Sequence, residues 1–556
     1  MDHTTTDPPL VTAAARFAAY VREWVKSKER TRLPTELTEM LSLLGEQTEW
    51  RVFVDGTKNL GHQASTVMLL RRLIDLTTFQ GRVVIVYADY DRAILGYTAY
   101  KLSLMFTGID PRQLDNQVAS YASCSEIRFL PFHRADELRE PVIFGFTGGA
   151  DDLAFNGAAA LNVRFFLRLQ PYLWDDPPSS PRDAYHECSR IEQPNGQHFY
   201  PIEAWPELQA MAIQPPLSPS EEAKNASWHW YKTKQEFDTG LACRMYNAWA
   251  VLDTSHQGGC LLWPVYGLQH FENDAAHIAL SCALVGLSLA RKLSSTILLC
   301  SFSPMQVSSD WADLVDALSQ DLASGEYEMP RLTAALAQRN AVDINTGRLQ
   351  ALDLIRWARA LGDWLSANCT GSALVLHRSS HAGRWNRIDA DLSTVLTLHG
   401  DVAVHLIELG PIALDVFQQF VMEADLPCVI EGQATANFLT TLGQPFLQLL
   451  RREHVIKNGY ATLGDIILNA VAEHMAVLAR SLRDLSPMSM SDKSALGDPS
   501  EYCQKLDRVV QALDDATNKE SMVHRYFLEL AEHFSRPVND KLTMMLLALR
   551  EVMLAQ

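Results

Sequence analysis

The feature that most constrains this fold is the stretch 402–449, in which short apolar runs alternate with helical patterns. The apolar runs cover 402–406, 428–430 and 445–449, and their lengths suit buried strands. Between the first two runs, apolar residues recur every three or four positions, which gives a helix one face that can lie on a sheet. Buried strands alternating with such helices are typical of repeated βαβ units, so the sequence predicts an α/β fold with parallel strands.

A glycine turn, residues 431–435 with the sequence EGQAT, lies between the second of these strands and a short helical pattern. Such a turn presents unpaired backbone N–H groups at the positive end of the helix dipole, where phosphate binds. The carboxylate of Glu431 would repel a diphosphate, so we expect it to accept a hydrogen bond from a ribose or sugar hydroxyl. Gln433 and Thr435 are further donor-binding candidates. The alternative is a purely structural turn, in which Gly432 supplies backbone freedom and Thr435 caps the helix.

The order of motifs around this turn resembles the donor half of GT-B glycosyltransferases. Within that class it is most similar to the arginine rhamnosyltransferases that modify elongation factor P, on Ala424-Asp425, Glu431-Gly432 and Gly443-Gln444-Pro445-Phe446. The resemblance implies two Rossmann-like domains facing a cleft. It also implies that the Gly-Pro corner beginning at Leu409 lies beside the nucleobase, and that the donor diphosphate is held at Thr435, Ala436 and Asn437.

A second pattern of strand, glycine-containing loop, helix and strand covers residues 50–87. It is typical of the opening of a doubly wound domain, but it has neither GxGxxG nor the lysine spacing of a P-loop, which argues against a dinucleotide or ATP site. Its Leu60-Gly61-His62 step resembles the Gly-His step of several GT-B enzymes and makes Gly61 an acceptor-side candidate. The paired-aspartate loop of the rhamnosyltransferases is replaced here, so their catalytic base does not transfer directly.

Sugar transfer with inversion needs a base that takes the proton of the acceptor, and an Asp, Glu or His at the cleft can do this. Asp55, before the glycine loop, and His62, within it, are the candidate bases. The structural alternatives are that Asp55 only shapes the turn before Gly56 and that His62 only caps the following helix.

Three further apolar runs, at 127–130, 142–146 and 163–169, extend the predicted sheet of this first domain. The loop after the second run carries Asp151, a further acceptor-side candidate, because loops at the carboxyl ends of parallel strands line the ligand crevice. The proline-rich segment 175–227 is predicted to be an irregular insertion.

A new βαβ unit begins after residue 253, with strand 260–266, loop 267–274, helix 275–293 and strand 296–302. This restart favours two doubly wound domains over one long sheet. In the loop, Gly267 and His270 are candidate donor contacts, and a helix cap is the alternative role for His270.

A later strand, 373–377, delivers Arg378 to the same edge of the sheet. Its cation would neutralise the departing diphosphate in place of a metal ion. The alternative is an ordinary surface ion pair.

The predicted organisation is a helical segment at 1–48, an acceptor domain at 49–253 with the insertion 175–227, a donor domain at 254–465 and a helical region at 466–556. The last helix, near 544–554, is expected to return to the first domain, as the final helices of GT-B proteins do. A chain of 556 residues is long enough for two cores of ordinary size.

Composition excludes several functional classes. The formal charge of −18 disfavours nucleic acid as a partner, because a polyanion would be repelled. The nine cysteines show neither paired nor metal-ligand spacing, which suits a reducing compartment. The N-terminus lacks the regions of a signal peptide, and the most apolar helix is too short to span a bilayer, so we expect a cytoplasmic protein without a membrane span.

Together these patterns predict a glycosyltransferase that needs neither a metal nor a cofactor, with a nucleotide-sugar as its donor substrate. Its acceptor is a small molecule or a protein side chain. One alternative is a nucleotide-sugar epimerase or hydrolase on the same architecture. The other is a non-enzymatic protein that binds a partner and kept only the fold.

Overall fold

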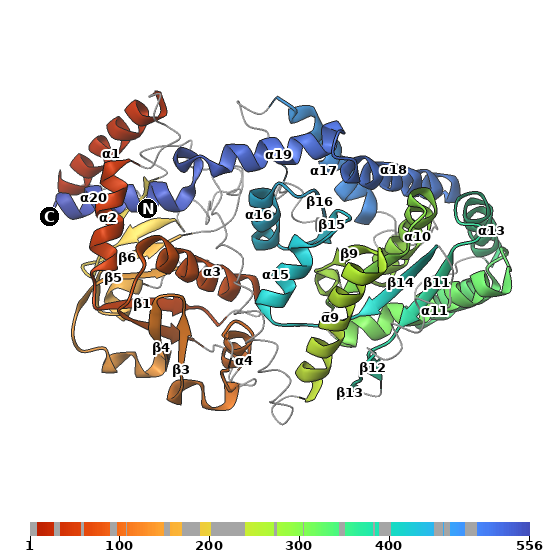
Figure 1. Cartoon of the computed structure of the whole chain (residues 1–556), viewed down its shortest axis with the longest axis horizontal. Coiled ribbons are helices and arrows are strands. Elements are labelled where there is room, and N and C mark those ends of the chain that lie inside the picture. Colours follow the sequence, from red (N-terminus) through yellow and green to blue (C-terminus); the bar gives the residue numbers. More distant parts are fainter. Residues whose placement is uncertain are drawn as a thin grey trace.

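Two separate β-sheets, each covered by helices, organise the computed structural model of the chain (Figure 1). We call the part around the eight-stranded sheet the first lobe and the part around the six-stranded sheet the second lobe. The structure describes residues 8–26, 34–56, 60–88, 97–106, 108–148, 156–169, 189–201, 239–271, 275–303, 305–343, 351–381, 384–388, 402–449, 460, 467–483 and 498–556. The α/β class predicted from the sequence is confirmed.

The sheet of the first lobe has the strand order β3-β4-β2-β1-β5-β6-β7-β8. Its central strands are parallel and coincide with the five predicted apolar runs: β1 (Glu49–Val54), β2 (Arg82–Tyr87), β4 (Cys124–Pro131), β5 (Val142–Thr147) and β6 (Val163–Arg168). Three short antiparallel strands lie at its edges: β3 (Val118–Tyr121), β7 (Arg190–Glu192) and β8 (His198–Phe199). The prediction that 175–227 is wholly irregular is therefore wrong, because β7 and β8 pair with this sheet.

Helices from both ends of the chain cover the first lobe. The N-terminal helices α1 (Pro8–Lys26) and α2 (Thr35–Gly45) pack against the final helix, α20 (Lys541–Leu554), which therefore returns to the first lobe as expected (Figure 1). The remaining elements of this lobe are α3 (Leu60–Thr77), α4 (Tyr97–Ser103), α5 (Gly157–Ala160) and the short 3₁₀ turns η2 (Pro111–Asn116) and η3 (Phe132–Glu137). Helix α3 already begins at Leu60, so Gly61 and His62, which were expected in the loop, lie in its first turn.

The sheet of the second lobe is entirely parallel, with the order β11-β14-β10-β9-β15-β16. Its strands lie where the apolar runs predict them: β9 (Leu261–Val265), β10 (Ile297–Ser301), β11 (Ala373–His377), β14 (Ala403–Glu408), β15 (Cys428–Ile430) and β16 (Phe446–Gln448). A separate antiparallel pair, β12 (Ser380–His381) and β13 (Arg384–Trp385), follows β11.

The second lobe is covered by helices on both faces of its sheet. They are α9 (Thr239–Gly258), α10 (Ala275–Leu293), α11 (Met305–Ser324), α12 (Pro330–Asp343), α13 (Ala351–Asn368), α15 (Leu414–Met422), α16 (Gln433–Leu442), α17 (Asn469–Arg483), α18 (Pro499–Thr517) and α19 (Met522–Ser535), with the 3₁₀ turn η5 (Leu268–His270). The 3₁₀ turn η7 (Pro537–Asn539) follows α19, and its Val538 packs in the core of the first lobe. Helix α19 packs on α16 and leads through η7 into α20, so the C-terminal segment joins the two lobes.

The prediction that the most apolar helix is too short to span a bilayer is wrong, because α10 is long and apolar enough to cross a membrane, and among the described helices it alone meets that criterion. However, 83% of its most apolar stretch is buried within the second lobe, where it contacts β14, α11 and α18. A central position in a core accounts for such a composition.

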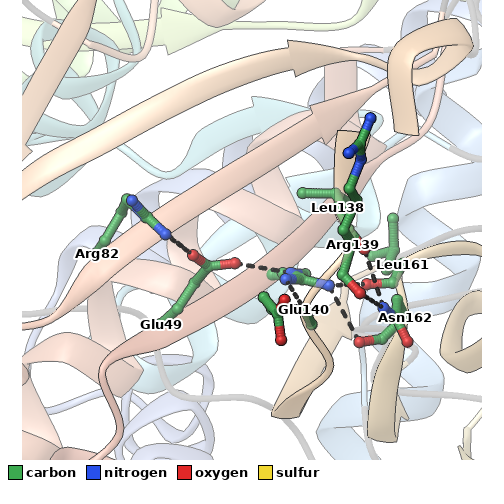
Figure 2. A network of polar contacts seen from close by, with 8 residues as sticks. Glu49, Arg82, Leu138, Arg139, Glu140, Leu161 and Asn162 are labelled. Atoms are coloured by element: carbon green, nitrogen blue, oxygen red, sulfur yellow. Dashed lines mark hydrogen bonds and ion pairs between the residues drawn. The ribbon is translucent and has the colours of Figure 1, made fainter. Parts of the chain in front are cut away.

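A buried arginine ties together the amino ends of three strands in the first lobe. Arg51, on β1, donates to Glu49 Oε1 at 2.7 Å and to the carbonyls of Glu140, Leu161 and Asn162 at 2.6–3.0 Å. Glu49 also pairs with Arg82, and Figure 2 shows these two residues at one end of the network, with Leu161 and Asn162 at the other. The network lies at the opposite edge of the sheet from the carboxyl-end loops, so it stabilises the lobe without contributing to a site there.

Candidate functional site

The topology of each sheet identifies one place where a ligand is expected. In the second lobe, the chain continues from β9 to β10 on one side, whereas β15 lies on the other side of β9. In the first lobe, β1 lies in the same way between β2 and β5. Open α/β sheets bind ligands beyond the carboxyl ends of the strands at such a switch point, because the flanking connections leave in opposite directions and open a crevice there.

Two of the predicted donor residues meet at the switch point of the second lobe. Gly267 follows β9 and Glu431 follows β15, and these strands pair through Val265 and Val429. Gly267 has a φ of +99°, and a Cβ atom there would lie 2.4 Å from the Cβ of Glu431. Only glycine therefore fits this position, and its close approach fixes where the Glu431 side chain leaves the backbone.

Tyr266 helps to hold the turn at 431–435 in place. Its N–H donates to the Val429 carbonyl at 2.8 Å, and its ring lies 5.0 Å from that of Phe417. Burial, and then the charge of Glu431, raises the pKa of Tyr266 to about 12, so the phenol remains neutral around neutral pH. The carboxylate of Glu431 is thus the anionic group that acts on this phenol at the switch point.

Helix α16 begins immediately after this turn, with Gly432 as its N-cap and no side-chain hydrogen bond to the cap. The amides of 433–435 have no helical carbonyl in front of them, so they are the donors available to an anion. This corrects the expectation for Ala436 and Asn437. The Ala436 N–H donates to the Gly432 carbonyl at 3.1 Å, its side chain is fully buried in the core, and Asn437 lies in the second helical turn.

Leu409 does not fit the donor role that the resemblance implies. Its side chain is fully buried in the core, and its N–H donates to the Ser301 carbonyl at 2.8 Å. The adjacent Gly410 has a φ of +67°, and a Cβ there would lie 2.3 Å from the ring of Trp385. The Gly-Pro corner is therefore packed beneath Trp385 instead of being open to a ligand.

Arg378 is also displaced from the expected position. Strands β14 and β10 separate its strand, β11, from β9, so at about 4.8 Å per strand it starts about 14 Å from β9. Its nearest carboxylate, Asp313, is 3.8 Å away, and both side chains are well exposed. The structure therefore favours the surface ion pair over a role at the diphosphate beside Glu431.

In the first lobe, Asp55 lies at the carboxyl end of β1, next to β5, and is 6% exposed. Its Oδ1 accepts from the Gly56 N–H at 2.7 Å, and its carbonyl accepts from the Gln63 side chain at 2.6 Å. The bond from the Gly56 N–H is the contact expected if Asp55 only shapes the turn, which is the structural alternative. Asp55 nevertheless occupies the switch point of this sheet, where an acceptor-side residue is expected.

Helix α3 packs tightly against the loop after β5. Thr66 Oγ1 and Gly148 exchange hydrogen bonds of 3.1 Å, and a Cβ on Gly148 would lie 3.0 Å from the backbone of Ser65 and Thr66. Gly61 lies in the first turn of this helix. The side chains of His62, His270 and Gln433, and the whole of Asp151, lie outside the described residues.

A polar cluster that was not predicted from the sequence lies at the carboxyl ends of β11 and β14. Glu408 is 2% exposed and accepts from the N–H and Oγ of Ser380 at 3.0 and 2.6 Å. The buried rings of His377 and His405 approach to 2.9 Å between nitrogen atoms. In the sequence, each residue of this cluster is recognisable only as a polar residue within or directly after an apolar run. The cluster anchors the β12–β13 pair on β14.

No protein-family model and no curated protein matches this chain. Among the described residues, no group of three or more His, Cys, Asp or Glu side chains is arranged to hold a metal ion.

A pocket of about 240 Å³ lies away from the switch point of the first lobe. It is lined by α2, the second half of α3 and the start of α20, including Leu41, Arg72 and Leu546. Arg72 is twelve residues from the start of α3, which corresponds to about 18 Å along the helix. The pocket therefore does not belong to the candidate site.

Proposed function

We propose that this chain is a glycosyltransferase of the GT-B type, with a nucleotide-sugar donor bound on the second lobe and an acceptor on the first. The observation that carries the proposal is the convergence of Gly267, Glu431 and an uncapped helix start at the switch point of a parallel sheet. The amides of 433–435 suit a diphosphate, and the carboxylate of Glu431 suits a hydroxyl of the ribose or sugar.

In the proposed reaction, a nucleophilic atom of the acceptor attacks the anomeric carbon of the sugar. The bond from that carbon to the diphosphate oxygen breaks, and the diphosphate leaves with the bonding electrons. The amides of 433–435 are oriented before the reaction, so they stabilise the charge that develops on the leaving oxygen. The proton of the acceptor passes to Asp55, at the first switch point, or to His62.

Replacing Gln433 by Pro tests the role of the helix amides. Gly432 has φ and ψ of −77° and 137°, the region that precedes proline, and proline is tolerated at the first helical position. The variant therefore removes one N–H donor while it keeps the helix. Because a hydrogen bond to a charged group contributes about 1.5–3 kcal/mol, we expect the Kd for a nucleoside diphosphate to rise about 10- to 100-fold in calorimetry.

The matched control is Gln433→Ala, which removes the same side chain and keeps the amide. Its Kd should stay close to that of the wild type. Equal Kd values for the proline and alanine variants would refute the diphosphate site, and so would a wild-type chain that binds no nucleoside diphosphate in a panel of the common bases.

Replacing Glu431 by Gln tests the hydroxyl contact. The neutral amide is a weaker acceptor than the carboxylate, so we expect the affinity for the best nucleoside diphosphate to fall by about tenfold. Inorganic pyrophosphate, which has no ribose, should bind no more weakly than to the wild type. If both ligands lose affinity equally, Glu431 acts on the turn as a whole and the assigned contact is wrong.

A further inference from the structure

Consecutive arginines on helix α3 pair with carboxylates of two different segments, helix α15 of the second lobe and the C-terminal segment that joins the lobes. Arg71 pairs with Asp415 at the start of α15, in the second lobe. Arg72 makes a two-pronged pair with Asp540, at 2.7 and 2.6 Å, where the C-terminal segment enters the first lobe. We propose that α3 carries a latch and a pivot: the Arg71–Asp415 pair opens when the lobes separate, whereas the Arg72–Asp540 pair stays formed. The proposal is independent of the chemistry at the site.

A few polar contacts hold the latch in place at the seam, where the two lobes meet near the Arg71–Asp415 pair. Besides Arg71–Asp415, the Leu414 N–H donates to the Leu104 carbonyl at 3.0 Å and Arg244 donates to the Tyr100 hydroxyl at 3.1 Å, whereas the bond from Arg71 to the Met105 carbonyl lies within the first lobe. The Asp415 side chain is 27% exposed, so water reaches it readily. The Arg71 side chain is only 7% exposed, so the pair is hydrated on its Asp415 side and Arg71 reaches water when the lobes separate.

The pivot, the Arg72–Asp540 pair, is buried, and further hydrogen bonds hold Asp540 in place. The Asp540 side chain is 1% exposed and also caps α20 by accepting from the N–H and Oγ1 of Thr543 at 3.1 and 2.6 Å. The helix that follows is buried along most of its length in the core of the first lobe. Separating Arg72 from Asp540 would leave a buried charge without its partner, so this contact persists during any movement of the lobes.

Apolar packing across the latch side is sparse. Among the described residues, Met68 packs against the cores of both lobes, Leu414 joins the core of the first lobe and Leu104 joins a cluster of the second. Small, polar contacts between domains permit relative motion. Because α3 also bonds to Asp55 and Gly148 near its start, it connects the switch point of the first lobe to the latch.

Hydrogen exchange on the full-length chain tests the latch. Leu414 is the first residue of α15, so its amide has no helical acceptor and its bond runs to Leu104 in the other lobe. We expect Arg71→Met to accelerate exchange of the Leu414 amide about tenfold or more, because local opening governs exchange there. The Ala436 amide, bonded within the second lobe, should exchange as in the wild type. Small-angle scattering should show a larger radius of gyration.

Asp415→Asn removes the charge of the other partner and should give the same faster Leu414 exchange and larger radius of gyration. The latch can therefore still be tested if one of the two variants folds poorly. Arg134→Met, which breaks only exposed pairs with Asp115 and Glu137, is the matched control and should change neither observable. Unchanged Leu414 exchange in Arg71→Met or Asp415→Asn would overturn the latch, and so would equal acceleration of the Leu414 and Ala436 amides. Arg72→Met should instead accelerate amides throughout α20, and an effect confined to Leu414 would overturn the pivot.

Discussion

Replacing Arg51 by Met is expected to lower the free energy of unfolding by about 3–5 kcal/mol, the usual cost of breaking a buried ion pair by removing one partner. The guanidinium is 3% exposed and bonds Glu49 and three backbone carbonyls, those of Glu140, Leu161 and Asn162 (Figure 2). Methionine fills the volume but leaves these acceptors buried without a donor. Urea unfolding followed by circular dichroism measures the change.

The matched control for this variant is Arg82→Met, which removes the other partner of Glu49. The Arg82 side chain is 43% exposed, so water can replace it, and the expected loss is about 1 kcal/mol or less. If the two variants lose equal stability, the carbonyl contacts of Arg51 contribute nothing and the account of this network is wrong.

Replacing Glu192 by Gln is expected to cost a similar amount, about 3–5 kcal/mol. One oxygen of this fully buried carboxylate accepts from both Arg168 and Arg190 at 2.8 Å, and the other accepts from the Gly157 N–H at 2.6 Å. Glutamine has nearly the same shape, but it takes away the negative charge between two buried guanidinium groups. The loss should appear as a lower midpoint of urea unfolding with an unchanged slope.

Glu137→Gln provides the comparison, because Glu137 pairs with Arg134 at the surface and is 52% exposed. This control should unfold at the same urea concentration as the wild type. If the Glu192→Gln protein is as stable as the control, groups other than Glu192 balance the charges of Arg168 and Arg190. An increased slope would instead indicate a change in the unfolded or native ensemble.

The strands at the centre of both sheets were predictable because they are buried on both faces. A parallel strand between helical layers has a mostly apolar sequence, so β1, β9 and β14 could be placed within a residue or two, even though Arg51 and His405 interrupt two of them. The edge strands β7 and β8 were missed for the opposite reason. Strand β7 is Arg-Ile-Glu, and its charged residues are buried only because Arg168 on β6 supplies the partner.

The turn at 431–435 was also recognisable from the sequence, since glycine and a helix start are local signals. The positions of Arg378 and Leu409 were not. Both follow predicted strands, but the order of those strands within the sheet decides which loops meet, and β10 and β14 separate Arg378 from the switch point. Likewise, no local pattern marks Arg71 and Arg72, because their partners are more than 300 residues away.

The amino-acid sequence alone determined the α/β class, the two successive sets of βαβ units and the glycine turn before α16, because these depend on local periodicity and backbone preference. Tertiary structure alone decided the strand order, the contact between Gly267 and Glu431, the burial of Leu409 and the pairing of α3 with α15 and with the C-terminal segment. These features depend on contacts between residues far apart in the chain, which the periodicity of a single segment does not encode.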